Sequence, residues 1–327
     1  MELDRPGAPP TFFSASPTAS RRSRAVDATA DAASADGPSA RQNHAMKLLI
    51  VTPTLGESPF LDETMRSIAA AQAQGVEILH ILSAPAPRVA ALAARYPRAT
   101  VRPDAGREGG IYGAINCGLF GAVSQEWDWF TYINDDDLLG PGFATVFREH
   151  AKPKNERVIA YGDVRNIDEK GRSLGLQSVE RSPAFFRPLL FQGVSLFTQQ
   201  GSIVSRRAAL DLAGFRQQFS LCADLDFWVR SMVAGLRHRY YGCEVGQFRI
   251  RAGQASHDVA LRLKQRAAIL RQIPGTPPGA LSRGCAHARF YACNLPRYAA
   301  RFRAVGWRRS NQLLAETTLH SPGVAKT

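Results

Sequence analysis

The chain has 327 residues, 45% of them hydrophobic and 9% aromatic, so it can bury the core of one large or two smaller domains. Its five cysteines form no C-x-x-C pair, which argues against a zinc ribbon or a disulfide framework and favours a reducing, cytoplasmic setting. Its apolar stretches fall well short of the roughly 20 residues that a membrane-spanning helix needs. We therefore expect a globular protein that does not cross a membrane by itself.

The net charge of +13 is concentrated near the C-terminus. Residues 259–327 hold twelve Lys or Arg against a single acid, Glu316, whereas residues 1–258 are close to neutral. Aromatic residues lie among these charges: Phe290, Tyr291, Tyr298, Phe302 and Trp307. Three interpretations stay open for this basic tail: a solvated helical appendage, a segment that lies on an anionic membrane surface, and, least favoured, a nucleic-acid-binding element.

Residues 1–45 are rich in Ala, Ser, Pro, Asp and Arg and show no hydrophobic periodicity, which predicts a disordered N-terminal extension. They lack the continuous apolar core of a secretory signal. Met46 directly precedes the first apolar strand-like run, KLLIV, so we expect the natural start to be Met46.

From Met46 onward, short apolar runs alternate with helical segments, a pattern typical of βαβ units and a parallel sheet. The predicted elements, in order, are a strand at 47–51, a helix at 58–74, a strand at 76–82, an Ala-rich helix ending at Arg95, a strand at 101–102, and a helix at 111–123. The glycine-rich segment 106–110 leads into the last of these helices, where a backbone can approach a phosphate closely or simply make a tight turn.

The next apolar run stops abruptly at three consecutive aspartates, in the stretch FTYINDDDLLGP at 130–141. Three carboxylates at one strand end repel each other, and a hard divalent cation with oxygen ligands would hold them together. Ligands of open α/β sheets bind outside the carboxyl ends of the strands, which is where this loop would lie. A solvated acidic turn is the alternative interpretation.

Several blocks, taken in order, resemble family 2 glycosyltransferases of the GT-A fold, most closely the bacterial members that build cell-surface polysaccharides. These blocks are TPT, GGIYGAINCGL, YINDDDLLGP, IAYGDV, TQQGSIVSRRAALDLAGF and ADLDFWVR, and the resemblance covers Lys47 to Gly253. It implies a single GT-A-like α/β domain, residues 46–253, with a mostly parallel, Rossmann-like sheet flanked by helices. Residues 46–140 would form the nucleotide-binding half and residues 141–253 the acceptor half, followed by a basic helical tail at 254–327.

The same resemblance implies transfer of a sugar, with inversion, from a nucleotide-diphosphate sugar to a hydroxyl of a glycan or lipid-linked acceptor, with Mg²⁺ or Mn²⁺ as cofactor. The aspartates match the family's DXD region, so Asp135 and Asp136 are expected to bind the donor and Asp136 and Asp137 the metal. Asp224 matches the position of the catalytic base that takes the acceptor proton. Asp226, two residues later on the same predicted helix, is the alternative base, and is otherwise expected to cap the helix or to pair with Arg230.

Further donor-binding candidates are Thr52 and Pro53 after the first strand, Tyr112 and Asn116 on the helix after the glycine-rich segment, and Gln200. Each of these residue types is also common in turns or in helix packing. Arg249 and Arg251 could neutralise a diphosphate, and His257 could contact metal or phosphate. We expect the enzyme to be cytoplasmic, and peripheral on the inner membrane face if the basic tail touches lipid.

Two departures from the family pattern leave the nucleotide open. The stretch ILSAP at 81–85 stands where an acid that faces the base is usual, and Gly113 stands where the family has an aspartate. A catalytically inactive sugar-nucleotide binder and a nucleic-acid-binding protein are the competing functions. A nicotinamide dehydrogenase is disfavoured because no G-x-G-x-x-G follows the first strand. The segment 168–200, with Phe185, Phe186 and Phe191, is expected to be either an acceptor-facing loop or part of the core.

Overall fold

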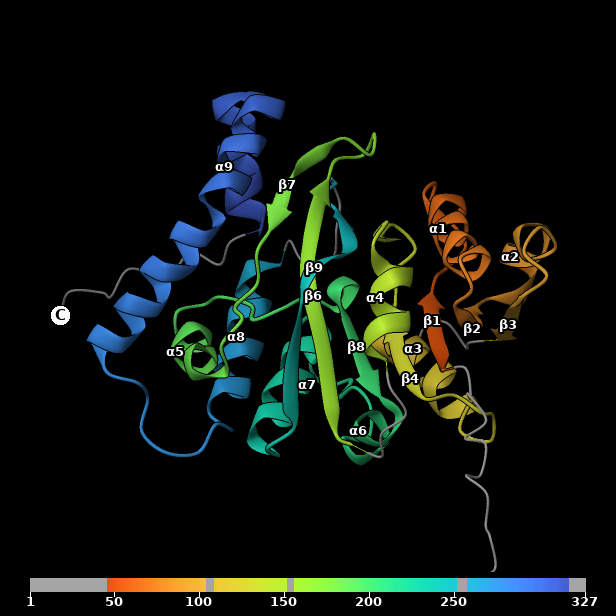
Figure 1. Ribbon diagram of the computed structural model, residues 1–327, viewed down its shortest axis with the longest axis horizontal. Coiled ribbons are helices and arrows are strands. Elements are labelled where there is room, and N and C mark those ends of the chain that lie inside the picture. The colour runs from red at the N-terminus through yellow and green to blue at the C-terminus, as the bar shows by residue number, and fades with distance from the viewer. Residues whose placement is uncertain (1–45, 104–108, 152–155, 252–257, 318–327) are drawn as a thin grey trace, which may run out of the picture. The chain divides into compact units, whose positions relative to one another are not determined.

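A mixed sheet of nine strands organises the protein, with strands in the order β3-β2-β1-β4-β8-β6-β9-β5 and β7 paired to β6 (Figure 1). The computed structural model describes residues 46–103, 109–151, 156–251 and 258–317, and their side chains as far as residue 306. The strands are β1 (Lys47–Pro53), β2 (Glu77–Ala84), β3 (Ala99–Pro103), β4 (Trp129–Tyr132), β5 (Leu138–Leu139), β6 (Val158–Ile167), β7 (Ser173–Gln177), β8 (Ser202–Ser205) and β9 (Arg237–Arg249).

Helices connect and cover these strands. They are α1 (Leu61–Ala73), α2 (Ala86–Ala93), α3 (Gly110–Gly121), α4 (Phe143–His150), α5 (Phe186–Phe191), α6 (Arg206–Asp211), α7 (Ala223–Val233), α8 (Val259–Leu270) and α9 (Ala280–Thr317), with short 3-10 turns η1 (Pro183–Phe185) and η2 (Gln199–Gly201). The long α9 is interrupted at Gly306, whose backbone (φ 73°, ψ 171°) is not helical.

The strand directions bring distant loops to one edge of the sheet. β1 pairs in parallel with β2 and β4, and β2 with β3. β8 runs antiparallel to both β4 and β6, so β6 again points the same way as β4, and β9 is parallel to β6. The carboxyl ends of β1, β4, β6 and β9 therefore meet at the same edge, which is where ligands bind in open α/β sheets.

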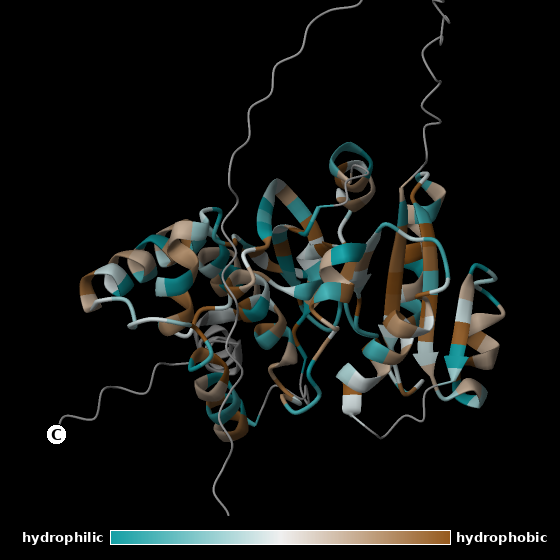
Figure 2. Ribbon diagram, turned by 90° about the horizontal axis from the view of Figure 1, so that it is seen from below, coloured by the Kyte–Doolittle hydropathy of each residue, from teal (hydrophilic) through white to brown (hydrophobic). Residues whose placement is uncertain are grey.

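Alternating side chains of β1 pack into two separate hydrophobic core clusters. Leu49 and Val51 lie in a cluster with residues of α3, α6 and α7, whereas Leu48 and Ile50 pack with residues of α1 and α4. Figure 2 shows that the long strands of the first half are mostly hydrophobic along their length. A strand buried on both faces reads as a continuous apolar run, which is why KLLIV was recognisable in the sequence.

The predicted α/β, GT-A-like fold is confirmed, with a parallel first half and a mixed second half. The aromatic segment within 168–200 belongs mainly to the core, because Phe186 is fully buried and Phe185 and Phe191 pack against the same cluster. The described part of the basic tail is helical, as predicted. It also contributes to that cluster, through Ile269, Ile273, Ala286 and Phe290. Residues 1–45 lie outside the described residues.

None of the five cysteines, all of which fall in the described ranges, takes part in a disulfide. Among the helices that the structure describes, none combines the length and the apolar character needed to span a membrane.

Candidate active site

The loop that follows β4 carries the three aspartates and is tied to the loop that follows β1. The Thr54 hydroxyl donates a hydrogen bond to Asp135 Oδ2 at 2.5 Å, and the Ser58 hydroxyl donates to the Asp135 carbonyl at 2.9 Å. Asp135 keeps part of its surface exposed. Burial raises the pKa of the Asp135 carboxyl, although the Thr54 hydrogen bond counteracts this effect. Asp135 is thus held in place by protein while one side faces solvent.

Asp137 is fully buried and organises the loop from inside. Its Oδ2 accepts hydrogen bonds from Gln200 Nε2 at 2.6 Å and from Asn134 Nδ2 at 3.2 Å, and its Oδ1 accepts from the backbone N–H of Arg249 at 3.0 Å. Burial, and secondarily the neighbouring charge of Asp136, raise the pKa of the Asp137 carboxyl well above its usual range. Asp137 therefore connects β4, η2 and the end of β9.

Asp136 contacts two arginines: Arg249, the last residue of β9, and Arg251, two residues beyond it. Arg251 Nε donates to Asp136 Oδ2 at 2.7 Å, and Arg249 Nε donates to the Asp136 carbonyl at 2.9 Å. Arg249 is fully buried and forms an ion pair with Glu63 of α1 at 2.6 Å. The Arg251 side chain remains about 30% exposed, so its guanidinium is the cation of the pair that also reaches solvent.

The oxygen donors of this loop fit a hard divalent cation. Within the described ranges, no group of three or more His, Cys, Asp or Glu side chains is arranged to hold a metal ion by itself. Mg²⁺ and Mn²⁺ need no such group, because one or two carboxylates plus substrate phosphates are their usual first shell. Asp136 and the partly exposed Asp135 supply such carboxylates. The Asp137 carboxylate accepts hydrogen bonds from protein donors, and its predicted role as a metal ligand stays a prediction.

Asp224 begins α7 and lies against α3. Its Oδ1 accepts hydrogen bonds from the Tyr112 hydroxyl at 3.3 Å and from the Leu225 N–H at 2.7 Å, and the residue is partly buried. Burial raises the pKa of the Asp224 carboxyl above its usual value. A carboxylate with a raised pKa that, among the described residues, accepts a side-chain hydrogen bond only from Tyr112 is chemically suited to accept a proton.

Asp226 has the structural role expected for it. It is fully buried, and its Oδ2 accepts a hydrogen bond from Arg230 Nε at 2.7 Å. Arg216 NH1 lies 3.5 Å from Asp226 Oδ1. Because both of its oxygens face arginines, Asp226 serves the packing of α7.

Tyr132, the last residue of β4, connects the aspartate loop with Asp224. Tyr132 is buried, and this burial together with the charges of Asp224 and Asp137 raises the pKa of its hydroxyl well above the usual value. Both carboxylates therefore lie near one ring. Phe215 packs against Tyr132 and Tyr112, with ring centroids 5.2 and 5.7 Å apart.

Other candidates have contacts of a structural kind. The Thr52 hydroxyl lies 2.9 Å from His80 Nε2 on β2, and Thr52 and Pro53 are buried. Asn116 exchanges hydrogen bonds with the backbone of Phe215, at 2.7 Å to its carbonyl and 2.9 Å from its N–H. Their predicted roles in donor binding stay predictions. His257 and residues 106–108 lie outside the described residues.

The sequence analysis did not single out Thr54, Glu63 or Tyr132. Thr54 belongs to the TPT block, but the sequence offers no signal that its hydroxyl, rather than that of Thr52, faces the aspartates. Glu63 looks like an ordinary acid in the first turn of a helix, and its pairing with Arg249 joins residues 186 positions apart.

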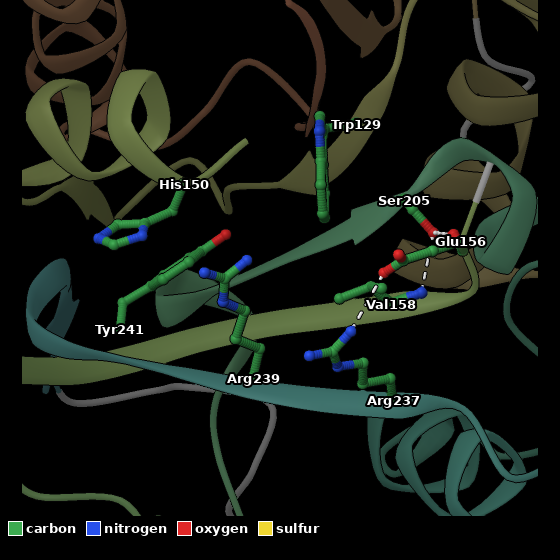
Figure 3. Close-up of a pocket in the computed structure, with 8 residues that line it drawn as sticks. All are labelled: Trp129, His150, Glu156, Val158, Ser205, Arg237, Arg239 and Tyr241. Carbon is green, nitrogen blue, oxygen red and sulfur yellow. Dashed lines mark hydrogen bonds and ion pairs between the residues drawn. The ribbon is translucent and has the colours of Figure 1, made fainter. Parts of the chain in front are cut away.

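A surface hollow lies at the other edge of the sheet, where β4, β6 and β9 begin (Figure 3). It is lined by Trp129, His150, Glu156, Val158, Ser205, Arg237, Arg239 and Tyr241. None of these is a predicted site residue, so the hollow and the aspartate loop are separate features.

The sheet order and the acidic loop at its carboxyl edge are those of a glycosyltransferase with the GT-A fold. The chain belongs to glycosyl transferase family 2, whose model matches residues 49–212. A comparison with curated protein sequences finds no match.

Solved structures resemble this fold at low sequence identity. Residues 1–349 of TarS from S. aureus, in complex with UDP-GlcNAc, match with a TM-score of 0.51 and 13% identity, over 83% of this chain and 79% of that one. A longer TarS structure matches with a TM-score of 0.50 and 11% identity over 81% of this chain, which spans only 45% of the TarS chain. A mannosyltransferase from Pyrobaculum calidifontis, PcManGT in complex with GDP-Man and Mn2+, matches with a TM-score of 0.49 and 18% identity, over 82% and 78% of the two chains.

Proposed function

We propose that this glycosyltransferase is an inverting, metal-dependent enzyme that moves a hexosyl group from a nucleotide-diphosphate sugar to a hydroxyl of a glycan or lipid-linked acceptor in cell-surface polysaccharide synthesis. The observation that carries the proposal is that Tyr112, which donates to Asp224 at 3.3 Å, packs on the same Phe215 ring as Tyr132, which ends β4 just before the aspartate loop. A proton acceptor and a donor site within reach of one substrate are what an inverting transfer needs.

Asp224 acts as the base. The acceptor oxygen attacks the anomeric carbon as its proton passes to Asp224, the bond between that carbon and the diphosphate oxygen breaks, and the electron pair leaves with the diphosphate. Tyr112 holds the carboxylate through its 3.3 Å hydrogen bond. The raised pKa makes Asp224 a stronger base than an ordinary surface aspartate.

The aspartate loop binds the donor. Asp136, with Asp135 beside it, would hold Mg²⁺ or Mn²⁺, and Asp137 keeps the loop in shape through Gln200 and Arg249. When bound, the cation neutralises charge on the departing diphosphate. Arg251, which is exposed by about 30%, pairs with Asp136 here and adds a second positive charge at the same point.

The similarity to a TarS structure that holds UDP-GlcNAc supports a nucleotide-sugar donor. Ser83 stands at the end of β2, where the family usually has an acid facing the base, so the donor base is best identified by experiment. We further propose a cytoplasmic enzyme that attaches peripherally to the inner membrane face.

A thermal-shift panel tests the donor site. The full chain is heated with UDP, GDP, CDP and TDP and their sugars, each with and without Mn²⁺ or Mg²⁺. A ligand at about 100 times its Kd adds about 2.7 kcal/mol of stability, because it binds only the folded state. We expect one nucleotide to stabilise the protein in a metal-dependent way.

Asp136→Ala should abolish this stabilisation, whereas Asp211→Ala, which changes a partly exposed aspartate of α6, should not. If no nucleotide stabilises the wild type, the proposed donor site is wrong. Metal-dependent stabilisation that persists in Asp136→Ala would assign the metal to other residues.

A further inference from the structure

The long helix α9 is fixed to the domain by one narrow face. Ala286, Phe290, Asn294, Arg297 and Arg301 recur every three or four residues and are all buried. Asn294 fixes the register of this face, because its side chain donates to the Ser178 carbonyl at 2.9 Å and accepts from the Ser178 N–H at 3.0 Å. The orientation of α9 up to Gly306 is therefore set by the catalytic domain.

The opposite face of α9 is apolar and points outward. At 100° per residue, positions 281, 288, 292, 295 and 299 lie opposite the buried face. They are Leu281, Ala288, Ala292, Leu295 and Ala299, and all are exposed. Leu281 is 82% and Leu295 63% exposed. Phe302, 48% exposed, extends the same side of the helix.

Positive charge flanks this outward face. Arg303 is exposed beside it, and Arg289, whose side chain is 46% exposed, lies beside it too and pairs with Glu180 at 3.4 Å. From residue 259 to residue 315 the sequence contains no acid at all, and Glu316 is the first. An apolar helix face with basic flanks is the arrangement of helices that lie in a membrane interface.

We infer that the outward face of α9, defined by Leu281, Ala288, Ala292, Leu295 and Ala299, binds the surface of an anionic lipid bilayer. The five positions span about 27 Å along the helix axis, at 1.5 Å per residue. The helix would lie flat, with the leucines among the acyl chains and the arginines at the lipid phosphates. Figure 1 shows α9 at the opposite end of the sheet from α2 and β3.

Charge separates this partner from the others that an apolar face might take. A second copy of the chain would bring the same basic flanks against each other, and like charges repel. Nucleic acid is bound through Lys or Arg contacts to phosphate, and the centre of this face has none. Membrane binding by α9 rests on the proposed function in one respect only: it would bring the active site to a lipid-linked acceptor.

Vesicle flotation of the full chain tests the inference without nucleotide or activity. The probes are vesicles of phosphatidylcholine alone and vesicles that contain 40% phosphatidylglycerol. The wild type should float with the anionic vesicles and far less with the neutral ones, and raising the salt concentration should weaken the binding. Leu281→Gln/Leu295→Gln should lower the partition coefficient by at least about tenfold, because burying one large apolar side chain already contributes such a factor.

The matched control is Val123→Gln/Val233→Gln, which changes two other exposed apolar residues, 42% and 48% exposed, outside α9. It should float like the wild type. Equal flotation of the leucine variant and the wild type overturns the inference. So does a wild-type dimer in light scattering that the leucine substitutions dissociate, and so does stronger binding to an oligonucleotide than to anionic vesicles. Nucleotide-dependent thermal stabilisation of the leucine variant should match the wild type, which separates a failure here from a failure of the donor site.

Discussion

Two aspartates in the first turn of α7 lie in contrasting environments. Asp224 is partly buried and touches Tyr112, whereas Asp226 is fully buried and pairs with Arg230. The N-terminal position alone favours an acid at both residues, because the helix dipole stabilises negative charge in the first turn. Asp226 is the poorer proton acceptor of the two, since both of its carboxylate oxygens face arginines.

We expect Asp224→Asn to lower kcat by about 10²- to 10⁴-fold, the usual contribution of a general base, with little change in melting temperature. Asp226→Asn should instead lower stability by about 3 kcal/mol, because it leaves Arg230 without its buried anion. Steady-state kinetics and denaturant unfolding of both variants measure the contrast. The reverse pattern would transfer the base to Asp226.

The pH profile offers a second test of Asp224. Because the pKa of its carboxyl is raised, kcat/KM should fall as the pH drops through that raised value, where the base becomes protonated. The Tyr112 hydrogen bond favours the charged form, so Tyr112→Phe should raise the pKa further and move the acid limb to higher pH. Tyr96→Phe, which removes a hydroxyl bonded to Asp62 instead, is the control. If the acid limb of the kcat/KM profile lies at the same pH in Tyr112→Phe as in the wild type, a group other than Asp224 is responsible for it.

At the scale of elements, the aspartate loop depends on how closely β9 approaches η2. A Cβ added at Gly246 would lie 2.0 Å from the Gln200 carbonyl oxygen, and Gln200 is the nearest side-chain donor to buried Asp137. Only a residue without a side chain allows this contact, and it brings the end of β9 to the loop.

Gly246→Ala should therefore destabilise the protein by about 1 to 3 kcal/mol, the usual cost of overpacking, and weaken nucleotide binding through the displaced Gln200. Gly279→Ala, where a Cβ meets nothing within 4 Å, is the matched control. Denaturant unfolding and the nucleotide thermal shift measure the two effects. Wild-type behaviour of Gly246→Ala would mean that the loop does not depend on this approach.

The sequence predicts the first half of the sheet well because its strands are continuous apolar runs. It does not predict β5 or β8, since two and four residues are too short for a periodic signal and β8 pairs antiparallel with strands far away in sequence. Similarly, three adjacent aspartates are chemically identical until folding buries Asp137, pairs Asp136 with Arg251 and leaves Asp135 partly open. Contacts with residues 63 to 115 positions away decide those differences, and the spacing of the aspartates carries no information on them.

At the scale of the whole molecule, the C-terminal helices are part of the core. The buried face of α9 includes Asn294, Arg297 and Arg301, which in sequence look like surface residues. The Gln265 side chain of α8 accepts a hydrogen bond from the Leu221 N–H at 3.0 Å. The Arg297 backbone of α9 packs closely against Gly175 of β7, since a Cβ added at Gly175 would lie 2.8 Å from Arg297 Cα.

Deleting residues 254–327 should lower the melting temperature by at least about 10 °C, because Ile269, Ile273, Ala286 and Phe290 together contribute several kcal/mol of apolar burial. Deleting only residues 307–327 should change it little and should keep vesicle binding, because Leu281 and Leu295 remain. Calorimetry and flotation of the two truncations compare these effects. If the protein that lacks residues 254–327 has the same melting temperature as the full chain, α8 and α9 are an appendage. If its melting temperature is lower, α9, the helix that we expect to bind the membrane, also stabilises the catalytic domain. Lipid binding would then stabilise the enzyme by mass action.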